Sequence, residues 1–123
     1  MSRVDTNLLG RWGEALVAED LRRKGYRILA AGYRTRFGEI DLIASTGQYL
    51  IFAEVKLRKN NCFASAREAV GPAKQRRLRA SAELWLSEHG TGGLQPRFDV
   101  AEVYAPEGMS TRHPSIEYIE NAF

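Results

Sequence analysis

Cysteine and histidine are scarce in this sequence of 123 residues, which contains one cysteine and two histidines. A single cysteine excludes an internal disulfide and a cysteine-based zinc site, and it fits a reducing cytosol. Cys62 could act as a nucleophile only with His89 or His113 as its base, and neither histidine lies in a recognisable motif. We therefore interpret Cys62 as a structural or incidental residue.

Long apolar runs are also missing. No run approaches the 18 or more residues, roughly, that a membrane helix needs, and residues 1–16 lack the apolar stretch of a secretory signal. We therefore expect a cytoplasmic protein with no membrane partner. Apolar residues make up 44% of the chain and charged residues 27%, which is typical of a globular protein, and the length suits one domain over residues 1–123.

The net charge of +3 is modest, but its distribution is uneven. Residues 56–79 contain eight lysines and arginines against one acidic residue, Glu68, whereas residues 80–123 contain two basic and seven acidic residues. The basic residues of the first segment are Lys56, Arg58, Lys59, Arg67, Lys74, Arg76, Arg77 and Arg79. Such a block predicts a surface that faces a polyanion. The alternative is an ordinary solvated helix face, and the charge block alone leaves both interpretations open.

Two segments have the periodicity of helices. Residues 5–25 place mostly apolar side chains on one face, and Gly25 is a natural C-terminal stop. The residues of that face are Leu8, Leu9, Trp12, Ala15, Leu16 and Glu19. Residues 72–89 form the second predicted helix, which begins at Pro72 and has an apolar stripe. That stripe consists of Leu78, Ala82, Trp85 and Leu86.

The remaining chain predicts mainly strands. We expect strands at 26–35, 39–44, 49–58, 97–104 and 116–123, with a loop and a short helical turn over 60–71. The order is a helix, three strands, a helix and one or two strands. This order predicts an α/β sandwich built on a mixed sheet.

The hairpin 38-GEIDLIASTGQYLIFAEVKLRK-59 contains charged residues where strands should be buried. Side chains alternate along a strand, so Glu54 and Lys56 share a face, and Glu39, Asp41 and Ile43 should share another. A turn near residues 46–48 pairs positions whose numbers sum to roughly 94, which brings Asp41 close to Glu54. The sequence therefore predicts two converging carboxylates with an ammonium group beside them.

Two adjacent carboxylates repel each other unless a cation lies between them. Oxygen ligands of this kind suit Mg²⁺ or Mn²⁺, and a lysine can position or deprotonate a water or stabilise a phosphorane-like transition state. Glu14, on the first helix, is a candidate further ligand. The alternative is a salt bridge of Lys56 with either carboxylate. Glu-x-Lys alone favours that alternative, but the full constellation beside a basic block favours a functional site.

Further short motifs extend this pattern over nearly the whole chain: 13-GE-14, 25-GYRIL-29, 38-GEIDLIA-44, 52-FAEVKLR-58, 69-AV-70, Lys74, 77-RL-78 and 97-RFDV-100. Together they resemble the YraN-like family of small bacterial proteins, a member of the PD-(D/E)XK nuclease superfamily that is similar to archaeal Holliday junction resolvases. The resemblance implies a restriction-endonuclease-like αβββαβ core in a bacterial, cytoplasmic protein.

The resemblance also implies roles for individual residues. It maps the metal-binding carboxylates onto Asp41 and Glu54, the acidic helix position onto Glu14 and the catalytic lysine onto Lys56, with the backbone carbonyl of Val55 as a further ligand of Mg²⁺ or Mn²⁺. Ile40 stands where many members of the superfamily have a proline. The residues expected to hold phosphates are Lys74, which matches the superfamily's helix lysine, with Arg76, Arg77, Arg79, Arg58 and Lys59. Related resolvases act as two-fold dimers, so a homodimer is implied as well.

Three hypotheses follow. The first is a metal-dependent endonuclease acting on DNA, with branched or recombination intermediates as substrates. The second is a nucleic-acid-binding module that keeps the fold without catalysis. The third is a protein-interaction component whose acidic C-terminal segment recruits a partner. Retention of all the charged groups favours the first.

Overall fold

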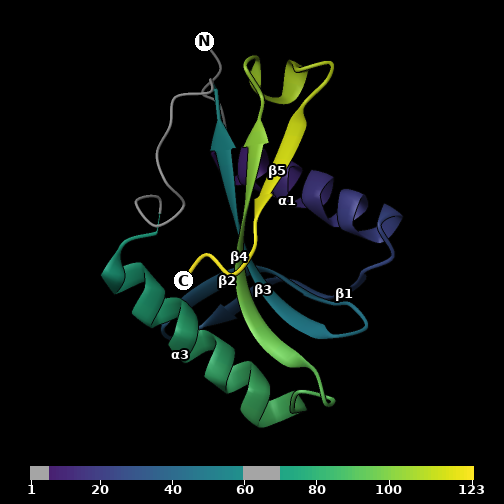
Figure 1. Cartoon of the computed structure of the whole chain (residues 1–123). Coiled ribbons are helices and arrows are strands. Elements are labelled where there is room, and N and C mark those ends of the chain that lie inside the picture. Colours follow the sequence, from purple (N-terminus) through teal and green to yellow (C-terminus); the bar gives the residue numbers. More distant parts are fainter. Residues whose placement is uncertain (1–5, 60–69) are drawn as a thin grey trace.

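Five strands form one mixed sheet with a helix on each face (Figure 1). The computed structural model describes residues 6–59 and 70–123. Cys62 and most of the loop and turn predicted for 60–71 lie outside the described residues. The elements are α1 (Thr6–Arg23), β1 (Arg27–Thr35), β2 (Gly38–Ser45), β3 (Tyr49–Arg58), α3 (Pro72–His89), β4 (Gln95–Tyr104), the 3-10 turn η1 (Gly108–Ser110) and β5 (Ser115–Ile119).

The sheet has the strand order β1-β2-β3-β4-β5, which is also the chain order. All neighbouring strands are antiparallel except β3 and β4, which run parallel along their whole length and are joined by the segment that contains α3. The mixed α/β sandwich and the αβββαβ order are therefore confirmed. The last strand is shorter than the expected 116–123 because the chain turns at Asn121, whose φ is +53°, and the Ala122 amide bonds to the Phe98 carbonyl.

Helix α1 covers one face of the sheet through Val17, Ala18 and Leu21, which pack on the strand residues Leu42, Ala44, Ile51, Ala53, Ala101 and Val103. The apolar face predicted for this helix was wrong in part, because Leu8 is 51% exposed and Ala15 lies at the surface. The buried stripe instead begins at Gly13 and continues through Val17, Ala18 and Leu21. A Cβ added at Gly13 would lie 3.3 Å from Leu57. The absence of a side chain at that position allows the helix to approach the sheet closely.

The end of α1 agrees with the prediction. Gly25 adopts a φ of +91°, its amide bonds to the Arg22 carbonyl, and the Tyr26 amide bonds to the Leu21 carbonyl. This pair of bonds is a Schellman motif, which a glycine at its left-handed position favours. The chain then turns directly into β1.

Helix α3 covers the opposite face. Its buried apolar residues Leu78, Ala82 and Trp85 belong to the stripe predicted from the sequence, and they pack on Ile40, Ile43, Leu50, Phe52 and Val100. Strand β3 therefore divides its side chains between two cores, as its alternation predicts. No helix among residues 6–59 and 70–123 is long and apolar enough to cross a membrane.

Candidate functional site

Asp41 lies where strand β2 separates from β3. The ladder between these strands runs from Ser45–Leu50 to Leu42–Ala53 and has no pair beyond. At the next position Asp41 Oδ2 accepts a hydrogen bond of 2.8 Å from the backbone amide of Val55. The aspartate thus accepts a hydrogen bond from an amide of β3 that does not pair with the backbone of β2, and its carboxylate is held between the two strands.

The alternation predicted for β2 was wrong at this point. Ile40 and Ile43 both pack on the α3 side, whereas Leu42 and Ala44 pack on the α1 side, so the expected face of Glu39, Asp41 and Ile43 does not exist. The partner strand β1 is irregular at the same place. Its Gly32, opposite Asp41 between the pairs Ala31–Leu42 and Tyr33–Ile40, has a φ of +68°. A left-handed residue disrupts the pleat, which explains the change of face.

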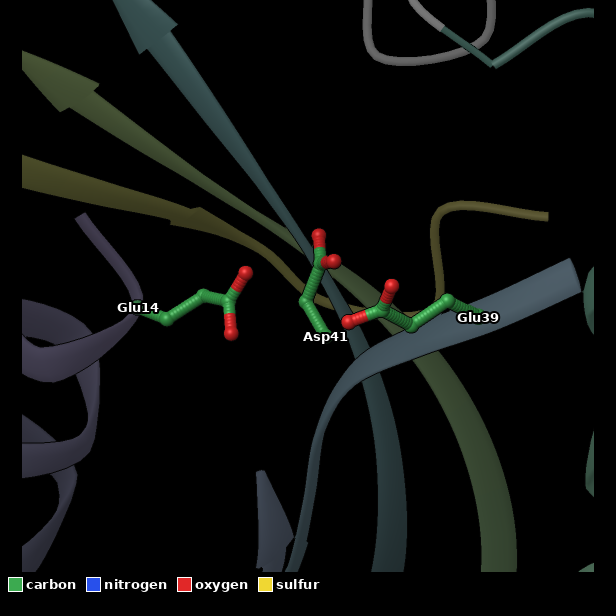
Figure 2. A group of neighbouring side chains, drawn as sticks. All are labelled: Glu14, Glu39 and Asp41. Atoms are coloured by element: carbon green, nitrogen blue, oxygen red, sulfur yellow. The ribbon is translucent and has the colours of Figure 1, made fainter. Parts of the chain in front are cut away.

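Three carboxylates converge on the α1 side of this irregularity. Figure 2 shows Glu14 of α1 and Glu39 of β2 extending toward Asp41 from opposite sides. One oxygen of each carboxylate lies within 4.8 Å of the others, and all three side chains are half-buried. The sequence predicted Glu14 and Asp41 as ligands but missed Glu39. Glu39 could have been predicted as a ligand because it lies two residues before Asp41 on the same strand.

Burial and nearby negative charges change the titration of two carboxyl groups of this cluster. Burial, together with the charge of Glu54, raises the pKa of Asp41 from 3.8 to about 7, although the hydrogen bond from Val55 opposes the shift. Burial also raises the pKa of Glu14, as do the nearby charges of Glu39 and Glu54, while Arg11 opposes them. Among the described residues, neither Glu14 nor Asp41 has an ion-pair partner, whereas Glu39 pairs with Arg34 at 3.5 Å.

Glu54 has different surroundings. Its side chain is 5% exposed, it is hydrogen-bonded by Lys74 of α3, and the Nζ of Lys56 lies 3.6 Å from its Oε1. The structure thus places Lys56 beside Glu54, as predicted. Glu54 influences Asp41 and Glu14 electrostatically, but its carboxylate is not part of the three-carboxylate cluster.

The two lysines differ in basicity. Burial and the neighbouring charge of Lys74 lower the pKa of Lys56. Burial acts on Lys74 in the same direction, but its hydrogen bond and ionic attraction to Glu54 outweigh that effect and raise the pKa of Lys74. Lys56 is therefore the lysine that gives up a proton more easily.

The other predicted phosphate-binding residues are divided among several environments. Arg58 pairs with Glu102 at 2.9 Å. The guanidinium of Arg79 lies 4.9 Å from the centre of the Phe98 ring and 5.7 Å from that of Phe123, a packing role that the sequence did not suggest. Lys59, Arg76 and Arg77 are exposed. Val55 contacts the site through its backbone amide, which donates a hydrogen bond to Asp41. Its backbone carbonyl remains a predicted ligand of the metal ion.

An open groove of about 800 Å³ leads to the three carboxylates between α1 and strands β1 and β2. Its lining consists of Asn7, Gly10, Arg11, Glu14, Ala15, Ala18, Arg22, Ala31, Gly32, Arg34, Glu39 and Asp41. We call it the α1 groove. Its three arginines, Arg11, Arg22 and Arg34, lie outside the basic block of residues 56–79, so the charge distribution along the sequence did not reveal them.

The carboxylate cluster has the donor chemistry that Mg²⁺ or Mn²⁺ requires. It offers hard oxygen ligands from two elements within one small volume, and the pKa values of two of its members, Glu14 and Asp41, are raised by burial and by neighbouring carboxylates. It contains no thiolate or imidazole, which would favour softer metals. Glu14, Glu39 and Asp41 would hold such an ion, whereas Glu54, the other carboxylate predicted as a ligand, is held by Lys74.

A mixed sheet with one helix on each face is an α/β fold consistent with a restriction-endonuclease-like core. The chain belongs to the uncharacterised protein family UPF0102, the YraN-like group, whose model matches residues 13–103. It is similar to the UPF0102 proteins of Mesorhizobium japonicum, with 46% identity over 99% of this chain and 91% of the relative, and of Vibrio vulnificus, with 42% identity over 85% and 88%. A UPF0102 protein of Syntrophotalea carbinolica is 47% identical over 77% of both chains.

Proposed function

We propose that this protein is a Mg²⁺- or Mn²⁺-dependent endonuclease that hydrolyses phosphodiester bonds of DNA, with branched or recombination intermediates as the substrates to test first. The observation that carries the proposal is the convergence of Glu14, Glu39 and Asp41 next to the Lys56–Glu54–Lys74 cluster. An ordinary surface salt bridge would not gather three carboxylates whose mutual repulsion has to be offset.

The protein's own groups have separable tasks. Glu14, Glu39 and Asp41 provide the negative oxygen cage, and Asp41 is held in position by the Val55 amide. A divalent cation bound there would supply charge that stabilises the transition state and would make a nearby water more acidic. Hydrolysis then requires attack of a water oxygen on phosphorus, loss of one water proton, and cleavage of the bond to the leaving oxygen.

Lys56 is suited to assist that proton transfer. Its lowered pKa means that it releases its proton more readily than an ordinary lysine, and in its charged form it can attract a phosphate oxygen. Lys74 is held by Glu54 and remains protonated, so it provides fixed positive charge at the same site.

The test is a cleavage assay with labelled linear, flap and four-way DNA in Mg²⁺ and in Mn²⁺. Lys56→Ala should reduce cleavage by about 100-fold or more, the range that a missing proton-transfer group produces, without loss of the folded state. Lys24→Ala is the matched control, because Lys24 is an exposed lysine that pairs with Asp20. Cleavage by Lys56→Ala at the wild-type rate would refute the assignment.

The same samples separate the enzyme from a non-catalytic binding module. A module would bind labelled DNA with a strong salt dependence but would cleave no substrate in the panel and would take up no Mn²⁺ at millimolar concentration. The proposal expects Mn²⁺ uptake, measured by electron paramagnetic resonance, that Asp41→Asn abolishes. A homodimer remains part of the proposal, and sedimentation of the DNA-bound protein tests it.

A further inference from the structure

We infer that the α1 groove binds the phosphate backbone of duplex nucleic acid and does so without reading its sequence. This inference rests on the proposed function, because it assigns the substrate path of the same site. It differs from the expectation based on the sequence, which assigned phosphate binding to the basic block of residues 56–79.

Arg11 and Arg22 mark the two ends of one face of α1. They are eleven residues apart, close to three full turns, so both side chains leave the helix in nearly the same direction and about 16 Å apart along its axis. Neither forms an ion pair with a carboxylate among residues 6–59 and 70–123. Arg34 stands on the opposite wall of the groove, on β1, where its side chain is 83% exposed and pairs with Glu39 at 3.5 Å.

Apart from the three carboxylates, the lining beside these arginines is made of small residues. It consists of Gly10, Ala15 and Ala18 on the helix and of Ala31 and Gly32 on the strand. Such a floor allows a phosphate backbone to approach closely, and the span of about 16 Å corresponds to roughly five nucleotide steps along one strand of a duplex. The carboxylates lie within this span, next to Arg11.

Apart from its arginines, the groove has few of the groups that other modes of recognition use. Its described lining contains no aromatic side chain on which an unpaired base could stack, and Asn7 is its only amide side chain. Single-strand binding usually relies on aromatic platforms, and sequence recognition relies on donors and acceptors directed at base edges. Arginines over a smooth floor instead favour backbone contacts with a duplex.

The decisive comparison is between two neighbouring arginines. Arg22 lines the groove, whereas Arg23 points elsewhere and pairs with Glu19 at 3.5 Å. Both lie in the last turn of α1 and carry the same charge, so they contribute alike to the helix dipole and to the net charge. Arg22→Ala and Arg23→Ala therefore differ mainly in their position relative to the groove.

Binding is measured by fluorescence anisotropy with a labelled blunt duplex and with its separate strands. All variants carry Lys56→Ala and are measured in Mg²⁺, so that the carboxylates can hold a cation while cleavage is suppressed. Arg22→Ala should weaken duplex binding about three- to tenfold and reduce the slope of log K against log salt by about one, while Arg23→Ala leaves both nearly unchanged. Arg11→Ala and Arg34→Ala should act like Arg22→Ala. Duplexes of unrelated sequence should bind equally, and the single strands more weakly.

Equal behaviour of Arg22→Ala and Arg23→Ala, or tighter binding of the single strands, would overturn the inference. So would unchanged affinity in the groove variants together with loss of binding in Arg76→Ala/Arg77→Ala. Its failure is distinguishable from failure of the proposed function. If the protein cleaves DNA in a metal-dependent way but the groove variants bind duplex normally, the proposed function stands and the inference about the groove fails. If the groove variants lose duplex binding but no substrate is cleaved, the inference stands and the proposed function fails.

Discussion

Replacing Asp41 by asparagine separates the stability of the fold from the binding of a metal. The asparagine keeps the shape of the side chain, and its Oδ1 can still accept the hydrogen bond from the Val55 amide. It removes a carboxylate whose pKa burial and Glu54 raise from 3.8 to about 7. A shift of about three units corresponds to at most about 4 kcal/mol of native-state destabilisation when the group is ionised.

The sign of the effect follows from the two pKa values. The unfolded chain loses the Asp41 proton near its ordinary value of 3.8, while the native protein keeps it up to about 7. Unfolding is therefore increasingly favoured as the pH rises through this window. Asp41→Asn should leave the stability unchanged below about pH 4 and increase it fully above about pH 7, by about 2–4 kcal/mol.

Urea denaturation in EDTA, repeated across this pH range, measures the effect. A second series with Mn²⁺ should stabilise the wild-type protein in proportion to its occupancy, and it should have little effect on Asp41→Asn. Asp20→Asn is a control with the opposite sign: hydrogen bonds from Tyr118 and Lys24 outweigh the effect of burial and lower the pKa of Asp20, so its loss should destabilise the protein at neutral pH. A wild-type stability equal to that of Asp41→Asn at pH 8, about one unit above the native pKa, would refute the electrostatic argument.

Two further substitutions test the packing around the site. Gly13→Ala should destabilise the protein by about 1–3 kcal/mol in denaturation experiments, because the added methyl group would lie 3.3 Å from Leu57. Gly10→Ala is the control: the added methyl group would enter open space, so the substitution should be neutral or stabilising by up to about 1 kcal/mol. Equal effects of the two substitutions would contradict this account of helix docking. Arg79→Met should lower stability by about 0.5–1 kcal/mol through loss of its contact with the Phe98 ring and should leave duplex affinity unchanged, whereas a loss of affinity in the anisotropy assay would show that Arg79 contacts phosphate.

Periodicity was a reliable guide where a strand is paired without interruption along one neighbour. Strand β3 is paired with β4 over its whole length, so Glu54 and Lys56 share a face with Leu50 and Phe52, as the alternation predicted. The apolar stripe of α3 was predicted correctly for the same reason, because a regular helix keeps its spacing. These parts of the fold follow from local geometry.

Alternation failed at Asp41, where β2 separates from β3 and Gly32 of the neighbouring strand adopts a left-handed conformation. Such an irregularity depends on pairing between distant segments, and the sequence of one strand does not contain it. Arg11 and Arg22 were missed for a related reason. Their helix position shows that they share a face, but only the docking of α1 shows that this face borders the carboxylates.

The bond from the Val55 amide to Asp41 also affects how relatives should be compared. Asp41 satisfies a backbone group that would otherwise be left without a partner, so a descendant that had lost all chemistry would still have a structural reason to retain an aspartate or asparagine there. Glu14 and Glu39 have no comparable backbone bond in the described structure. Selection for activity should therefore be more visible at these two glutamates than at the aspartate.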